Sequence, residues 1–527
     1  MTEASALFEP FPPVKDREFK ADQNNPAIRL YGRRFYQDQT PVEYLAELLL
    51  VFASPKEEGG GATFSLSVDD AIGTARYWPE DRVALKLFAF FPTSRLDTRH
   101  AVHRKAYGEA ISEIRSRIDA SDTDKDEVVR LLQSLLGGFV GLVCNRTWVT
   151  NTFLPASTVL LGREVAWLHS AAQRKRDLND WEDVSHLFAR DRHLFMARGG
   201  ELLFLQLANL FASPDSEAMM AGFDPTTYKH LNQCELSQIQ VRLELGLRAI
   251  LESTNVGFTG LVGFIENALS RFRIDAAPRE ACLGWVPVVS RTEALLFAYE
   301  MDNICASTLG SLEKLDLLQL LCCMQVLRSL CFQASRFDNG QGNTNGFVGN
   351  YAWIVVDPEA RSGMPLRMLA QSSFDRVQEL LYRVLRQARQ EGAIEKKFNE
   401  ARKHGFKIFP RIAKQLGLVI PRTGVGQRFV LPPALLRFLV AALIPPGQRV
   451  RLTVFYERVF AHYGIALGSQ QLATALHWMG GESGPADYAV ATDTGWLEEA
   501  LQQGGFLVEL SDAVSMVHNP GAGRDAA

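Results

Sequence analysis

The chain has 527 residues, of which 47% are hydrophobic and 22% are charged, and its formal net charge is −4 at pH 7. This length allows two to four domains with a substantial buried core, and the composition is that of an ordinary globular protein. Because the chain is acidic overall, it is not expected to coat nucleic acid over its whole surface, so any nucleic-acid contact should be local.

The cysteines and the N-terminal residues favour a reducing compartment. The seven cysteines are odd in number and widely spaced, and no CxxC pair occurs among them. This pattern favours reduced thiols over a disulfide framework or a zinc site. Residues Met1 to Lys20 contain three prolines and no apolar core, unlike a signal peptide, and the longest apolar run, Leu317 to Leu327, is too short to span a bilayer. We therefore expect a cytoplasmic protein without membrane contact.

The first predicted domain, residues 1–92, is an arm followed by a strand-bearing region. Basic and aromatic residues are interleaved in the arm, and such a pattern can stack on bases and neutralise phosphates. Arg33, Arg34 and Tyr36 are therefore weaker candidates for nucleic-acid contact, although aromatic residues that pack the arm onto the core would give the same pattern. Alternation in Thr63–Val68 and the apolar run Val83–Phe88 predict strands.

The second predicted domain, residues 93–360, is a helical body. Between Leu315 and Leu327 apolar residues cover nearly the whole helix circumference, which predicts a central buried helix. His100 and His103 have the i, i+3 spacing of a metal-ligand pair, but they lie among cations without a nearby carboxylate or cysteine, so a solvated basic helix is the preferred interpretation. A basic cluster is a second weaker candidate for phosphate contact: Arg174, Lys175 and Arg176.

Helix signals, a hairpin signal and basic charge coincide in the third predicted domain, residues 361–432. Helices are expected over Phe374–Gln390, Ile394–Lys403 and Phe406–Leu416, with a glycine turn at Gly405. Two short apolar strands then flank a glycine-containing loop. Helix, helix, glycine turn, helix and hairpin in this order resemble the winged helix-turn-helix superfamily. The resemblance implies that the third helix enters the major groove and that the hairpin is the wing beside it.

The charge of this stretch supports nucleic-acid contact independently of the element order. From Lys396 to Arg428 nine basic residues face one acid, Glu400, and a duplex would gain affinity by releasing counterions at such a surface. The same charge run is also typical of a solvated face, and winged helices often bind proteins instead. The candidate nucleic-acid-binding residues are Arg402, Lys403, Lys407, Arg411, Lys414, Arg422 and Arg428.

The fourth predicted domain, residues 433–527, repeats the order of helices and a hairpin, and we interpret it as a degenerate second winged-helix unit. Its hairpin carries Glu509 and Asp512, which would repel phosphates, so protein contact or dimerisation is expected there. The expected elements are helices over Ala434–Ile444, Val454–Tyr463, Gln470–Met479 and Trp496–Gln503, a strand at Arg449–Thr453, and a hairpin of Phe506–Leu510 with Val514–His518.

Linear catalytic motifs are missing from the sequence: no HExxH, GxSxG, Walker A or zinc-ligand pattern occurs. Four acids, Asp69, Asp70, Glu80 and Asp81, precede Lys86 in a way that suggests a nuclease-like set, but Ala84 stands where that set needs a carboxylate. Since catalytic groups usually converge from distant segments, this weakens the enzyme reading without excluding it.

We therefore expect a mainly α fold with minor β structure, in which a large helical body is followed by tandem winged-helix domains. The leading functional hypothesis is a non-enzymatic subunit that binds nucleic acid, with duplex DNA as the favoured partner, or that acts as an adaptor. It would work with other protein subunits in a bacterial DNA-processing or phage-defence complex, without a cofactor, a metal or a catalytic residue. Two alternatives stay open: a purely protein-binding scaffold, and a metal-dependent nuclease-like enzyme with a non-linear site.

Overall fold

The computed structural model confirms a mainly helical protein with small sheets. The sheets have two or three strands each. The structure describes residues 7–14, 16–33, 35, 37–68, 75–94, 100–137, 146–167, 178–190, 198–213, 227–231, 235–253, 255–274, 279–338, 351–389, 395–480, 494–510 and 514–521.

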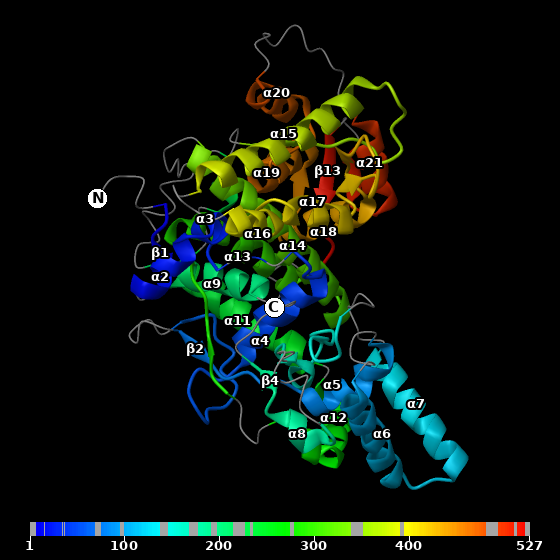
Figure 1. The fold of residues 1–527 in the computed structure, drawn as a ribbon. Coiled ribbons are helices and arrows are strands. Elements are labelled where there is room, and N and C mark those ends of the chain that lie inside the picture. Colours follow the sequence, from blue (N-terminus) through cyan, green and yellow to red (C-terminus); the bar gives the residue numbers. More distant parts are fainter. Residues whose placement is uncertain are drawn as a thin grey trace.

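A long buried helix, α14 (Ser311–Asp338), runs through the main hydrophobic core and confirms the predicted central helix (Figure 1). By length and composition it would also suit a membrane span, but 83% of its most apolar window is buried inside the protein, as in a core helix. The helices packed around it include α4 (Pro41–Ala53), α9 (Gly199–Phe211), α11 (Leu236–Glu252), α13 (Arg291–Ala306), α15 (Pro365–Gln387) and α18 (Pro433–Leu443).

Helices α4 and α9 pack closely, because Gly200 has no side chain at their contact and the Glu47 carboxyl group accepts hydrogen bonds from the N-terminus of α9. Glu47 of α4 accepts hydrogen bonds from the backbone nitrogens of Arg198 (2.8 Å) and Gly200 (2.6 Å), so its carboxyl group caps the N-terminus of α9. A Cβ on Gly200 would lie 2.4 Å from the carbonyl oxygen of Tyr44. Burial, with a further contribution from Glu201, raises the pKa of Glu47 to about 8.

A second hydrophobic core lies in the part of the molecule from which α6 and α7 project at the lower right of Figure 1. Its helices are α5 (Val83–Phe90), α6 (Ala101–Ser116), α7 (Asp122–Gly137) and α12 (Asn255–Ala268). The predicted strand at Val83–Phe88 is therefore wrong: α5 is buried on every side, and a short run that is apolar apart from Lys86 does not distinguish a strand from a buried helix.

Two further local predictions differ from the structure. Thr63–Val68 is not a strand, because its backbone bonds go to a helix end and a side chain: Ser65 donates to Phe52 O and Leu66 to Glu244 Oε1. His103 is not on a solvated helix face. It is fully buried, and its ring centroid lies 4.6 Å from that of Trp167.

The C-terminal third follows the predicted order of elements closely. Both expected hairpins form: β8 pairs with β9, and β12 pairs with β13, which also pairs with β10 to give the strand order β10-β13-β12. The elements are α15 (Pro365–Gln387), α16 (Glu395–Gly405), α17 (Ile408–Gln415), β8 (Val419–Ile420), β9 (Arg428–Phe429), β10 (Arg449–Arg451), α19 (Leu452–Tyr463), β11 (Ile465–Ala466), α20 (Ser469–Trp478), α21 (Gly495–Gln503), β12 (Leu507–Leu510) and β13 (Val514–His518).

One main core is shared by the helical body and the C-terminal third, since it includes buried residues from Ala27 to Val517. The parallel pair of β7 (Trp353–Ile354) with β11 adds a backbone link between the same parts. The division into four domains stays a prediction. The remaining helices and strands are β1 (Pro10–Phe11), α2 (Asp16–Gln23), α3 (Pro26–Tyr31), β2 (Arg76–Tyr77), β3 (Ala166–Trp167), α8 (Trp181–Ser185), β4 (Phe188–Ala189), β5 (Ala281–Cys282) and β6 (Val286–Pro287).

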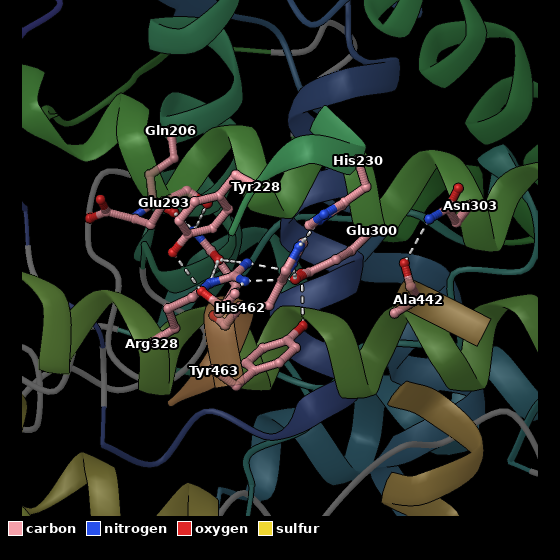
Figure 2. A network of polar contacts seen from close by, with 12 residues as sticks. Gln206, Tyr228, His230, Glu293, Glu300, Asn303, Arg328, Ala442, His462 and Tyr463 are labelled. Carbon is pink, nitrogen blue, oxygen red and sulfur yellow. Dashed lines mark hydrogen bonds and ion pairs between the residues drawn. The ribbon is translucent and has the colours of Figure 1, made fainter. Parts of the chain in front are cut away.

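A buried ionic network joins the helical body to α19 (Figure 2). Arg328 of α14 donates to both carboxylate oxygens of Glu300 on α13, at 2.7 and 2.9 Å. The Tyr463 hydroxyl donates to Glu300 Oε2 at 2.7 Å, and His462 Nδ1 lies 2.6 Å from Oε1. Burial alone would raise the pKa of Glu300, but Arg328 and His462 hold it below its ordinary value, so the group is a carboxylate.

A pair of neutral histidines extends this network toward the surface. His462 Nε2 lies 2.8 Å from His230 Nε2. Burial lowers the pKa of both rings. The pKa of His230 falls to about 2, because protonated rings so close together would repel each other as well. Since His462 donates its Nδ1 proton to Glu300, its Nε2 accepts, and His230 must be the donor.

Acid should weaken the protein through these histidines. Below about pH 6.5 the unfolded chain binds protons that the folded state does not, so stability falls as the pH falls. At pH 7.5, His230→Asn should lower the free energy of unfolding, because the hydrogen bond to His462 is lost. At pH 5 the difference in unfolding free energy between the variant and the wild type should be about 2 kcal/mol smaller, because only the wild type is destabilised by protonation of His230 in the unfolded chain. Urea unfolding at both pH values measures this, with the exposed His477→Asn as control. A gap that is the same at both pH values contradicts the prediction.

Candidate nucleic-acid interface

Helices α15, α16 and α17 are amphipathic, and each buries its apolar face in the main core. In α17, Ile408, Phe409 and Ile412 point inward. Gly405 does not have the positive φ that the predicted turn requires. It lies at the end of α16, where a Cβ would be 3.1 Å from the Ala27 side chain of α3, so its role is close packing. The positive φ occurs instead at Gly417, after α17.

Three of the seven candidate residues are exposed. Lys403 lies on α16, Lys407 lies at the junction of α16 and α17, and Arg422 lies in the loop between β8 and β9. Lys414, near the end of α17, is half-buried. We refer to Lys403, Lys407, Lys414 and Arg422 as the basic set. These side chains are placed where a polyanion in solvent can reach them.

The other three candidates already have partners inside the protein. Arg411 of α17 forms an ion pair with Asp38 in the segment before α4. The Arg402 guanidinium lies over the Tyr382 ring, 5.5 Å from its centroid. Arg428 is only 6% exposed and donates to the carbonyl oxygen of Pro358 at 3.3 Å. Burial, and then the charge of Arg367, lowers the pKa of Arg428.

The weaker candidates are only partly described. Arg33 forms an ion pair with Asp22 at 3.0 Å, and Phe35 beside it is buried, as expected if the aromatic residues pack the arm onto the core. The others, Arg34, Tyr36, Arg174, Lys175 and Arg176, lie outside the described residues.

The C-terminal sheet carries basic residues that were not selected from the sequence. Arg449 and Arg451 of β10 are exposed, and β10 pairs with β13 of the second hairpin. Asp512, which was expected to make that hairpin repel phosphates, lies outside the described residues. The sequence signal for these arginines was the strand expected at Arg449–Thr453, whose partner strand could not be identified from the sequence.

The groups considered for a nuclease site that lie in the described part of the chain already have partners, and Glu80 pairs with Arg82 at 2.8 Å. Lys86 is fully buried and donates to the carbonyl oxygen of Arg163 at 2.6 Å, and burial lowers its pKa to about 8. Asp81 pairs with Arg190 at 2.8 Å, whereas Asp69 and Asp70 lie outside the described residues. Within the described ranges, no group of three or more His, Cys, Asp or Glu residues is arranged to hold a metal ion.

Comparisons with protein-family models, with curated proteins and with solved structures give no match in any of the three.

Proposed function

We propose that this chain is a non-enzymatic nucleic-acid-binding subunit that contacts duplex DNA through the basic set. The observation that supports this is the exposure of Lys403, Lys407 and Arg422 within a stretch of nine cations and one acid, in a chain whose net charge is −4. Such a surface gains affinity from counterion release, so we expect contacts to phosphates rather than to base edges.

The element order supports a winged-helix reading of the same region. Three helices precede the β8–β9 hairpin, and in the last unit β10 pairs with the second strand of the β12–β13 hairpin. By the resemblance, α17 would be the helix that enters the groove. Because Arg411 of α17 is held by Asp38, we place the main contact at the junction of α16 and α17 and at the loop that contains Arg422.

A purely protein-binding scaffold is the second candidate, and exposed leucines favour it. Leu131 and Leu135 on the projecting helix α7 are 66% and 46% exposed, and their i, i+4 spacing puts them on one face. Exposed apolar pairs of this kind are suited to contact with another protein. As an adaptor, the chain would combine this face with the basic set inside a multi-protein bacterial DNA-processing or phage-defence complex.

Neutralising the three exposed members of the basic set tests the proposal. The variant Lys403→Gln, Lys407→Gln and Arg422→Gln should bind duplex DNA at least tenfold more weakly, because three phosphate contacts are lost. Its plot of log affinity against log salt should be less steep by about three. Fluorescence anisotropy in a salt series measures both quantities.

The matched control removes the same charge elsewhere, by Lys20→Gln, Arg104→Gln and Lys229→Gln at exposed positions. It should retain the affinity and salt dependence of the wild type. Equal losses in both variants, or wild-type binding that does not respond to salt, would contradict the proposal. Absence of binding to duplex, single-stranded DNA and RNA alike would favour the scaffold.

A further inference from the structure

Arg163 is a buried arginine whose guanidinium has no partner in the described residues. Its backbone is held on both sides: the N–H donates to Glu80 O at 2.8 Å, and the carbonyl accepts from Lys86 Nζ at 2.6 Å. Only 4% of the residue is exposed. Its Nε, Nη1 and Nη2 atoms have no hydrogen-bond partner there, although a guanidinium carries five N–H donors.

Three other buried arginines each form an ion pair with a carboxylate, unlike Arg163. Arg146 pairs with Glu43, Arg328 with Glu300 and Arg336 with Glu293, so each cation has a carboxylate beside it. Removing a guanidinium group from water without a counter-ion costs free energy. A buried guanidinium without a hydrogen-bond partner therefore indicates that a bound ion or another group completes the site. We therefore expect a bound anion at Arg163.

Charges of both signs surround Arg163. Burial lowers its pKa; Tyr77 and Asp81 oppose this effect, whereas the charges of Arg190 and Arg279 add to it. Asp81 is already paired with Arg190 at 2.8 Å, so it does not neutralise a second guanidinium fully. The Arg190 side chain is 7% exposed, whereas Arg279 is exposed. Of these two arginines, Arg279 is therefore the one that solvent reaches.

A pocket lies along the same backbone segments that hold Arg163. Its volume is about 340 Å³, and its lining includes Trp78, Leu161 and both members of the ion pair between Arg82 and Glu80. Gly162 packs against the Arg82 side chain, whose Nη1 pairs with Glu80 at 2.8 Å and whose Nε is buried without a hydrogen-bond partner in the described residues. The volume falls in the range of pockets that accept small organic molecules.

We propose that Arg163, assisted by Arg190 and Arg279, binds the phosphate group of a small molecule. Phosphate oxygens match the paired N–H donors of guanidinium groups, and one tetrahedral anion can accept from more than one arginine. The pocket beside Arg82 leaves room for the organic part of a phosphate monoester. This site is separate from the basic set and does not depend on nucleic-acid binding.

The test compares anion binding by the full-length wild type and three variants. Thermal unfolding is followed while inorganic phosphate or adenosine monophosphate replaces sodium chloride at constant ionic strength, and isothermal titration gives the affinities. Both phosphates should raise the unfolding temperature of the wild type by a few degrees. Arg163→Met should lose this shift, and without phosphate it should be at least as stable as the wild type, since an unpaired buried charge has been removed.

Arg279→Gln keeps the test decisive if Arg163→Met does not fold, because Arg279 is exposed. It should weaken binding at least fivefold, whereas the control Arg248→Gln, on the exposed face of α11, should not change it. Tighter binding of the monophosphate identifies a phosphate ester as the ligand, and equal binding identifies the free anion. No shift in the wild type, or the same shift in Arg163→Met, would overturn the proposal.

Discussion

Arg328→Met should destabilise the protein by about 3–5 kcal/mol, the cost expected when one partner of a fully buried ion pair is removed. Both Arg328 and Glu300 are completely buried, so the remaining carboxylate would be left uncompensated. Methionine keeps most of the apolar volume of the side chain but supplies no donor. The free energy of unfolding in urea at pH 7.5 measures the loss.

Two comparisons separate this effect from ordinary truncation. Arg383→Met removes the partner of Asp338 in a pair that is partly exposed, and this should cost no more than about 1 kcal/mol. Adding Glu300→Gln to Arg328→Met should recover part of the loss, because no buried charge then remains without a partner. If Arg328→Met and Arg383→Met are equally stable, the Glu300 network does not hold α19 to the body in the way described.

The order of elements in the C-terminal third could be predicted because its signals are local. Periodic apolar residues mark α15 and α17, and the glycine at Gly417 follows α17 as expected. The run at Val83–Phe88 could not be assigned in this way, because its residues are apolar at both even and odd positions. Whether this run forms a helix depends on the second core, and that core is completed by residues far away in the chain.

The candidate interface was only partly predictable for the same reason. Charge and spacing identified Lys403 and Lys407, which are exposed, but they could not show that Asp38, 373 residues before Arg411 in the sequence, pairs with it. The burial of Arg428 depends on the chain passing Pro358. Nothing in the sequence indicated the network around Arg328, because its partners Glu300 and His462 are brought to it only by the tertiary structure.

Gly200→Ala should destabilise the protein by about 3 kcal/mol or more, because the added Cβ meets rigid atoms. It would lie 2.4 Å from Tyr44 O and 2.6 Å from both Glu47 Cβ and Leu48 N, all of them on α4. The two helices would have to separate, and Glu47 would then no longer cap α9.

Gly263→Ala is the matched control for this substitution. Gly263 lies in the interior of α12, where a Cβ would meet nothing within 4 Å, so the same change should stabilise the protein by about 0.5–1 kcal/mol. The two alanine variants should therefore move the midpoint of urea unfolding in opposite directions. Similar midpoints would mean that α4 and α9 can separate at little cost, and that the capped contact at Glu47 does not determine how they pack.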